Sequence, residues 1–238
     1  MMKKTTVPNG IKNLLITTAI GWLALSQFSQ AETIGLLGLF QATNKSAVRS
    51  AVEQLEKDSV ASDCVLRREG MIINDQGTYE LGALDSFILI ECERSLLSNG
   101  KFPSLLKRIN AAGNNSKFLE GPINQFGHLG LSEPGTGRSY IIKLSDYNNI
   151  SPQQRETELL SLSAAVGHVK DHYNAEASIH VVNAQGMSRP DDVTVIYYNS
   201  SESGNKFREN NPDYMARISH FNEKHLRRFS YLEAVSNR

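Results

Sequence analysis

Residues 140–173 carry the sequence YIIKLSDYNNISPQQRETELLSLSAAVGHVKDHY, and this stretch decides the predicted fold. Its first eight residues are rich in aliphatic and aromatic side chains and predict a β-strand over 140–147. Ser151 and Pro152 predict the start of a helix, because serine caps a first turn, proline suits the first helical position and Gln154 completes a capping box. The apolar stripe of this predicted amphipathic helix consists of Leu159, Leu162, Val166, Val169 and Tyr173.

The remainder of the second half adds two strands, a helix and a strand. We predict strands at 178–183 and 193–199, a helix from Asn211-Pro212 to about Arg228, and a last strand at 230–235.

The first half predicts the same order of elements. Its strands are expected at 33–41, 65–73 and 87–93, with turn residues at 74–77 between the last two. Val48, Val52 and Leu55 recur at helical spacing after a cap at Asn44 or Ser46 and indicate one helix. A second helix is indicated by the apolar positions from Phe102 to Ile109, and residues 113–115 end it.

The two halves therefore repeat one pattern. Ile34 corresponds to Ile141 and Phe87 to Thr194, a separation of 107 residues in both pairs, although residue identity between the halves is negligible. We interpret the pattern as two β-α-β-β-α-β units, at 32–120 and 140–238, joined by a Gly- and Pro-rich linker at 121–139. Such units carry helices on one sheet face only, so two units in one chain can cover each other. A single irregular α+β domain is the alternative.

This arrangement resembles the ferredoxin-like dimeric α/β-barrel superfamily, in a tandem form that covers nearly all of the chain after residue 31. The resemblance implies an α+β fold of two tandem ferredoxin-like repeats with antiparallel sheets packed face to face. The superfamily includes cofactor-independent monooxygenases and haem proteins such as chlorite dismutase-like chains, which also join two repeats. Haem is therefore the cofactor that the resemblance suggests, and no stretch of the chain matches the haem-site motif of those proteins. The expected state is a monomer or a homodimer.

Two cysteines occur in the chain, Cys64 and Cys92. An even pair in an exported protein favours a disulfide, while free thiols or a redox pair stay open. In the ferredoxin-like topology these residues lie at the start of one strand and the end of its antiparallel neighbour, and pairing them places the hairpin midpoint at residue 78.

The first 31 residues indicate a secretory signal peptide. Three lysines precede an apolar run at 14–25, and small residues at Ser29 and Ala31 predict cleavage after Ala31. The run is too short to cross a membrane, so we expect a periplasmic or secreted protein with no stable membrane anchor after cleavage. Cleavage removes three lysines, so the 25 basic and 25 acidic residues of the full chain become 22 basic and 25 acidic residues. This near-neutral balance argues against a nucleic-acid partner, because binding to phosphates needs concentrated positive charge. The end of the last predicted helix explains the small basic cluster of Lys224, Arg227 and Arg228.

Strand alternation separates two faces in the second half. An aliphatic face is expected to lie under the helices and consists of Tyr140, Ile142, Leu144, Ile179, Val181, Val193 and Val195. A mixed face is expected to line the interface between the sheets and consists of Ile141, Lys143, Ser145, His180, Val182, Thr194, Ile196 and Tyr198. Lys143, His180 and Tyr198 are our candidates for a ligand pocket, with His225 of the last predicted helix as a fourth, and ordinary polar residues of a half-wet sheet are the alternative.

The histidines carry three further hypotheses. His225 falls in the middle of the apolar face of the last predicted helix, where a core residue, a haem ligand or a general base is expected. His168 and His172 stand at i and i+4, a spacing that lets two imidazoles share a metal ion. They lie roughly opposite the apolar stripe, so we expect them to face solvent and treat them as weak metal candidates.

No motif specifies a reaction, so three functions remain open. The first is an exported protein that binds a small molecule or a protein partner of the cell envelope. The second is a haem-binding or cofactor-independent oxidoreductase, as the resemblance implies. The third is a structural envelope protein with no ligand. A large hydrophobic cavity between the sheets would favour the first two, and an interface filled with side chains would favour the third.

Overall fold

The computed structural model describes residues 33–42, 50, 53–54, 57, 64–93, 107, 111, 113–125, 137–148, 150–166 and 173–236. The chain from Glu32 to Arg238 forms one compact unit. The first-half helices predicted around 46–55 and 102–109 lie almost entirely outside the described residues, although Glu53, Gln54 and Lys107 are helical.

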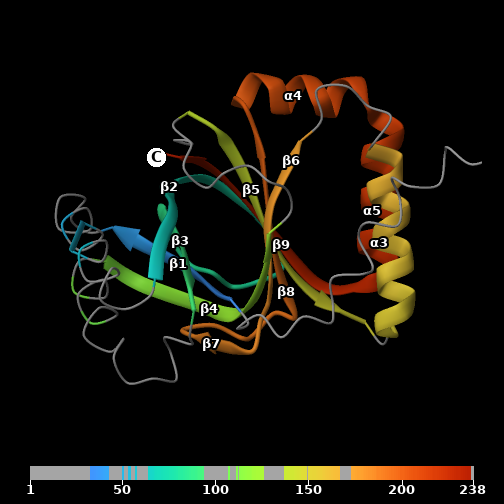
Figure 1. Ribbon diagram of the computed structural model, residues 1–238. Helices are drawn as coiled ribbons and strands as arrows, with labels where there is room; N and C mark the ends of the chain where they lie inside the picture. The colour runs from blue at the N-terminus through green and yellow to red at the C-terminus, as the bar shows by residue number, and fades with distance from the viewer. Residues whose placement is uncertain are drawn as a thin grey trace, which may run out of the picture. The chain divides into compact units, whose positions relative to one another are not determined.

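Every strand pairing in the described residues is antiparallel. The first-half strands are β1 (Ile34–Ala42), β2 (Cys64–Gly77), β3 (Ser86–Cys92) and β4 (Gly113–Gln125). The second-half strands are β5 (Ser139–Tyr147), β6 (Asn174–His180), the short β7 (Asn183–Gln185), β8 (Asp192–Tyr198) and β9 (Leu226–Ser236). Three helices belong to the second half, α3 (Pro152–Val166), α4 (Ser201–Asn210) and α5 (Pro212–His225), and Figure 1 shows α3 and α5 side by side.

The strands form one closed sheet rather than two separate sheets. The order is β1-β3-β2-β9-β5-β8-β6-β4, and β4 pairs back onto β1. The halves are joined by β2 with β9 and by β4 with β6, and the short β7 also pairs with β4, along the same edge as β6. Closure satisfies the backbone groups of strands that two separate sheets would leave as unpaired edges.

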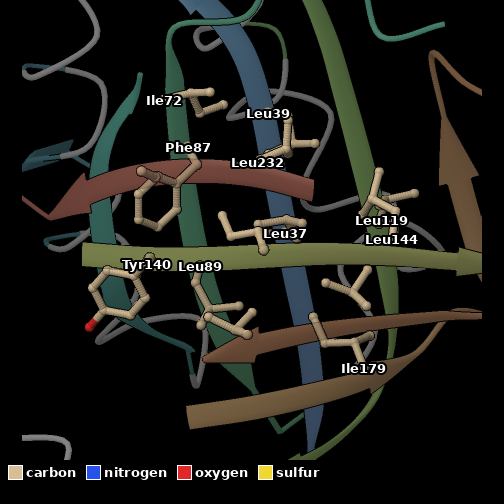
Figure 2. Packing of buried hydrophobic residues seen from close by; sticks show 14 of the residues in the cluster. Leu37, Leu39, Ile72, Phe87, Leu89, Leu119, Tyr140, Leu144, Ile179 and Leu232 are labelled. Atoms are coloured by element: carbon tan, nitrogen blue, oxygen red, sulfur yellow. The ribbon is translucent and has the colours of Figure 1, made fainter. Parts of the chain in front are cut away.

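The interior of this sheet is filled by apolar side chains from both halves. Leu37 and Leu89 of the first half meet Tyr140, Leu144 and Ile179 of the second, and Figure 2 shows how these side chains converge. The predicted orientation of the second half is therefore wrong. Its aliphatic face lines the interior, and Ile141 and Tyr198 of the mixed face pack against the helices. Strands enclose the interior on all sides, so the aliphatic side chains occupy it. Side chains between the sheet and the helices can extend their polar ends past the edge of that layer, so the mixed face lies there.

Several predicted boundaries also change. Residues 74–77 are not a turn, because β2 continues through them to pair with β9. Gly77 ends the strand with a φ of 143°, and a side chain there would collide with the carbonyl oxygen of Phe229. Strand β4 occupies residues 113–125, whereas the sequence analysis assigned the start of this segment to the end of a helix and residues from 121 onward to the linker. The helix α4 was not predicted, and α5 stops at His225 because β9 begins at Leu226 to pair with β5.

The predicted strand at 140–147 and the capped helix after it are present. Ser151 Oγ accepts a hydrogen bond from the backbone N–H of Gln154, as the cap requires. The predicted apolar stripe is wrong at Leu159, which is 38% exposed, and it holds at Leu162, which is partly covered. Among the helix residues whose burial is described, the other partly covered positions are Arg155, Glu158 and Ala165. The helix packs against α5, which rotates its covered face away from the predicted one.

Cys64 and Cys92 form the predicted disulfide. They lie directly opposite each other in the β2–β3 register, and the connection between these strands spans residues 78–85, beside the predicted midpoint. The bond closes a loop with a sequence separation of 28 residues.

Replacing both cysteines by serine should lower the unfolding free energy by about 3 kcal/mol, because the unfolded chain loses a loop constraint of this length. Urea titration of the variant and of the oxidised protein measures the difference. Reducing agent should destabilise the natural chain by a similar amount and leave the variant unchanged, and equal stabilities would contradict the structural role of the bond.

Candidate functional site

Three of the four predicted pocket residues lie in one layer, between the second-half strands and helices α4 and α5. Lys143 and Tyr198 come from β5 and β8, and His225 ends α5. The fourth, His180, ends β6 and is 57% exposed, with its Nδ1 3.0 Å from the Asp192 carboxylate. The layer rather than the sheet interior is therefore where the predicted polar groups gather.

Lys143 is held among neutral groups. Its Nζ donates a hydrogen bond to Asn222 Oδ1 at 2.7 Å, and Asn222 Nδ2 donates to the Tyr231 hydroxyl, also at 2.7 Å. The rings of Phe221 and Tyr231 lie 5.6 and 5.5 Å from the amine. We call these four residues the Lys143 site. Burial lowers the pKa of Lys143 to about 8, because water cannot solvate the ammonium fully.

His225 is buried beside this site. Its ring lies 5.1 Å from that of Phe221, and its Nε2 faces Glu158 Oε1 of α3 at 3.4 Å without forming an aligned hydrogen bond. The same carboxylate accepts a hydrogen bond from Lys224. His225 thus links α5 to α3, in agreement with the predicted core position on the helix.

Tyr198 belongs to an aromatic cluster at the other end of the layer. Its ring packs 5.8 Å from Phe207 and 6.4 Å from Tyr173, whose hydroxyl lies 2.7 Å from that of Tyr214. Burial raises the pKa of Tyr198 to about 12, so the phenol stays neutral. The cluster fixes α4 and α5 on the sheet, and it separates Tyr198 from the Lys143 site.

The residues between sheet and helices do not fit a haem at His225. A haem needs a flat space on the side of the histidine nitrogen, and here the Glu158 carboxylate lies 3.4 Å from Nε2 while the Phe221 ring packs against the imidazole at 5.1 Å. His168 and His172 lie outside the described residues. Within the described ranges, no group of three or more His, Cys, Asp or Glu side chains could hold a metal ion.

A buried ion pair inside the closed sheet was missed by the sequence analysis. Arg68 of β2 and Glu176 of β6 are 4% and 6% exposed, with Arg68 Nε 2.7 Å from Glu176 Oε1. Arg68 Nε also donates a hydrogen bond to the Tyr140 hydroxyl at 2.9 Å. The pair joins the two halves across the interior, and neither oxygen of Glu176 has an aligned hydrogen bond.

Two β-bulges direct this pair inward. The β2–β3 register shifts between Leu66 and Arg68, and the β6–β8 register shifts between Ala175 and Ala177. A bulge reverses the alternation of faces beyond it, so Arg68 joins the inner face although Leu66 lies on the outer one. The only available signal was the presence of charged residues within otherwise apolar strands.

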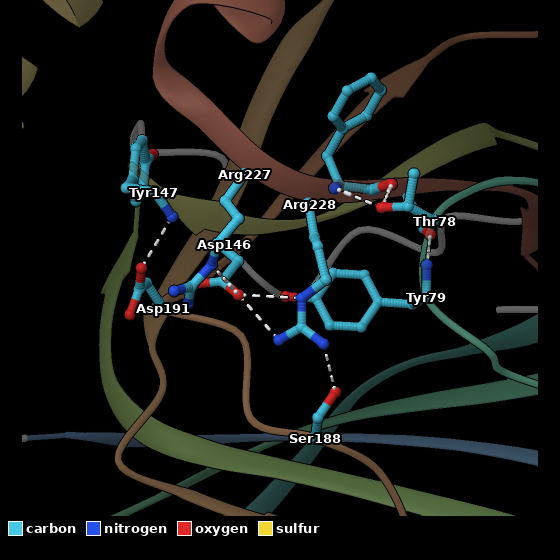
Figure 3. A network of polar contacts seen from close by, with 10 residues as sticks. Thr78, Tyr79, Asp146, Tyr147, Ser188, Asp191, Arg227 and Arg228 are labelled. Carbon is cyan, nitrogen blue, oxygen red and sulfur yellow. Dashed lines mark hydrogen bonds and ion pairs between the residues drawn. The ribbon is translucent and has the colours of Figure 1, made fainter. Parts of the chain in front are cut away.

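A second polar network joins residues of β5 and β9 with Tyr79 and Ser188, as Figure 3 shows. The carboxylate of Asp146 accepts hydrogen bonds from Arg227 and Arg228 at 2.7 Å each. Arg228 stacks on the Tyr79 ring at 4.6 Å and donates to Ser188. Burial opposes ionisation of Asp146, but the hydrogen bonds from both arginines outweigh it and lower its pKa. These arginines belong to β9 and serve this network, not the end of a helix.

Known structures share this fold. The crystal structure of chlorite dismutase from Candidatus Nitrospira defluvii in complex with imidazole is 13% identical to the chain, with a TM-score of 0.56 over 87% of this chain and 92% of that one. A candidate monooxygenase from Lactobacillus acidophilus NCFM is 10% identical, with a TM-score of 0.51 over 87% and 95%. An anthrone oxidase-like protein is 13% identical, with a TM-score of 0.50 over 87% and 94%.

The similarity is one of fold. Neither a protein-family model nor a curated protein sequence matches the chain. At these identities the shared architecture does not carry an activity with it. The described part of the chain contains no helix that is long and apolar enough to span a membrane.

Replacing Arg68 by methionine or Glu176 by leucine should lower the unfolding free energy by about 3–5 kcal/mol, because each single change leaves a buried charge without its partner. The double variant should lose less than either single variant, since it buries no charge. Urea titrations of all four proteins measure the coupling. Additive losses would contradict an energetic interaction across the interior.

Replacing Lys143 by methionine should raise the unfolding free energy near pH 7 by about 2 kcal/mol, because it removes a half-buried charge that has no counter-ion among the described residues. The natural chain should gain stability as the pH rises from about 8 towards 10.5, where its unfolded state still binds the proton that the folded state has lost. The advantage of the variant should shrink across this window. Urea titrations at several pH values measure it, and a constant difference would contradict the lowered pKa.

Proposed function

We propose that this chain is an exported protein of the dimeric α/β-barrel type that binds a small aromatic anion at the Lys143 site. A half-buried ammonium with neutral neighbours carries the proposal, since Lys143 has an amide and two aromatic rings around it and no carboxylate partner among the described residues. An aromatic carboxylate or phenolate would supply the missing charge and stack against Phe221 or Tyr231.

The tandem-repeat architecture is part of the proposal. In the first half the strands are ordered β4-β1-β3-β2, and in the second half they are ordered β9-β5-β8-β6. When the long strands are numbered within each half, both orders read fourth, first, third, second. Each half also carries a bulge in its second strand. The ferredoxin-like repeat explains both features.

Export is supported by two observations. The compact unit starts at Glu32, the residue that would follow cleavage after Ala31. The disulfide suits an oxidising compartment such as the periplasm.

The runner-up is an oxidoreductase. Its support is the shared fold with a chlorite dismutase and a candidate monooxygenase. Packing at His225 counts against the haem form, so the cofactor-independent form is the better version. In that form, Lys143 would stabilise the anion of a phenolic substrate, which again requires ligand binding at this site.

A structural envelope protein without a ligand is supported by the filled sheet interior. The Lys143 site is outside that interior, and it is what distinguishes the binding proposal from this one.

The first experiment uses protein exported with its own leader and purified from the periplasm. Native mass spectrometry and an absorption spectrum report leader cleavage, the disulfide, and any retained ligand or haem. Calorimetric titration with benzoate and 4-hydroxybenzoate, and with neutral benzyl alcohol as control, then tests the site directly.

Lys143→Met should weaken binding of the anions at least about tenfold, and binding should fall as the pH rises above about 8 because the amine loses its charge. Lys206→Met is the matched control, since Lys206 is exposed on α4 and pairs with Glu202. Equal binding by the natural chain and Lys143→Met would overturn the proposed function. Retained haem would favour the oxidoreductase.

A further inference from the structure

The amine of Lys143 differs in its partners from the amines of Lys206 and Lys224, and it shares an amide acceptor with Lys117, whose Nζ donates to Asn115 Oδ1 at 2.6 Å. Lys206 and Lys224 lie 2.7 and 3.2 Å from the carboxylates of Glu202 and Glu158, which favour the charged ammonium. Lys143 instead donates to a neutral amide oxygen in a half-buried setting. A neutral amide oxygen stabilises the ammonium less than a carboxylate does, and burial lowers the pKa of this amine to about 8.

We propose that Lys143 is a nucleophilic amine that forms a reversible imine with an aromatic aldehyde or ketone. The inference rests on the proposed binding of a small aromatic molecule at the Lys143 site, and it adds a carbonyl group as the reactive part of that molecule. The rings of Phe221 and Tyr231 flank the amine and favour an aromatic carbonyl compound over an aliphatic one.

The chemistry needs no oxidant or reductant. The lone pair of Nζ attacks the carbonyl carbon, the C–N bond forms, and the carbonyl oxygen takes up a proton to give a carbinolamine. Loss of this hydroxyl as water, together with the remaining proton of the nitrogen, leaves the C=N bond. Asn222 Oδ1 orients the attacking nitrogen, and hydrolysis reverses the reaction.

Tyr231 is suited to assist the loss of water. Its hydroxyl accepts a hydrogen bond from Asn222 Nδ2 and therefore keeps its own proton free to donate. Burial raises the pKa of Tyr231, so this proton is present at neutral pH. Asn222 thus connects the nucleophile with a proton donor.

The groups facing Lys143 predict its pH dependence. Tyr231 faces it from β9 and Asn222 and Phe221 from α5, while its partner on β8 is the uncharged Thr194. On the helices, Glu158 and His225 face each other beside Phe221. Imine formation should therefore rise through the titration of Lys143 itself, up to about pH 8.

The test treats the mature protein with benzaldehyde and sodium cyanoborohydride near pH 7.5, and peptide mapping by mass spectrometry follows each lysine. Lys143 should be benzylated at least about tenfold faster than Lys206, whose amine has a raised pKa. Asn222→Asp is the decisive variant, because it keeps the side-chain size and places a carboxylate beside Nζ. It should reduce labelling of Lys143 to the rate of Lys206.

Labelling spread evenly over the lysines, or unchanged labelling of Lys143 in Asn222→Asp, would overturn the imine proposal. Calorimetry with benzoate on the same protein separates the two hypotheses. If benzoate binds and Lys143 is not labelled selectively, the imine fails while the proposed function stands. If neither occurs, both fail. Circular dichroism of Asn222→Asp confirms that the variant is folded, and Lys143→Arg, which keeps the charge, provides a second variant that should lose the selective label.

Discussion

Closure of the sheet is the constraint on which the rest of the structure depends. Eight strands can satisfy their backbone groups on both sides only if β2 meets β9 and β4 meets β6, and both junctions join different halves of the chain. Neither half can therefore be complete without the other. The closed sheet also separates two environments, a dry interior filled with aliphatic side chains and an outer face covered by helices in the second half.

The positions of the polar groups follow from this separation of environments. An interior enclosed by strands tolerates a charge only if it is paired, and Arg68 meets Glu176 and Tyr140 there. The layer under α5 is open at its edge, so it can hold Lys143 with a neutral partner. The amine in this layer has an amide rather than a carboxylate as its partner, and it is the group on which the proposed ligand site is based.

The comparison with known structures concerns architecture. A chlorite dismutase and a candidate monooxygenase have the same fold at 13% and 10% identity, and this level of similarity leaves the chemistry to the individual side chains. Around His225 those side chains are Phe221, Glu158 and the rings beyond them, which leave the histidine in a helix–helix contact. The function must therefore be argued from Lys143 and its neighbours.

The sequence by itself determined the strands at the start of each half, the capped helix after β5 and the pairing of Cys64 with Cys92. These depend on local spacing, on turn residues and on the antiparallel register of neighbouring strands, all of which the chain carries in its order of residues. Lys143, Tyr198 and His225 could be selected for the same reason, since alternation and helical periodicity place them. Only the tertiary structure decided which face is the interior, because both faces of a strand can be buried and the closure of the sheet chooses between them. The tertiary structure also decided that Arg68 meets Glu176, because each side chain is turned by a one-residue bulge that no local pattern marks. It likewise decided that Asn222 and Tyr231 surround Lys143, because they come from elements about 80 residues away that only folding brings together.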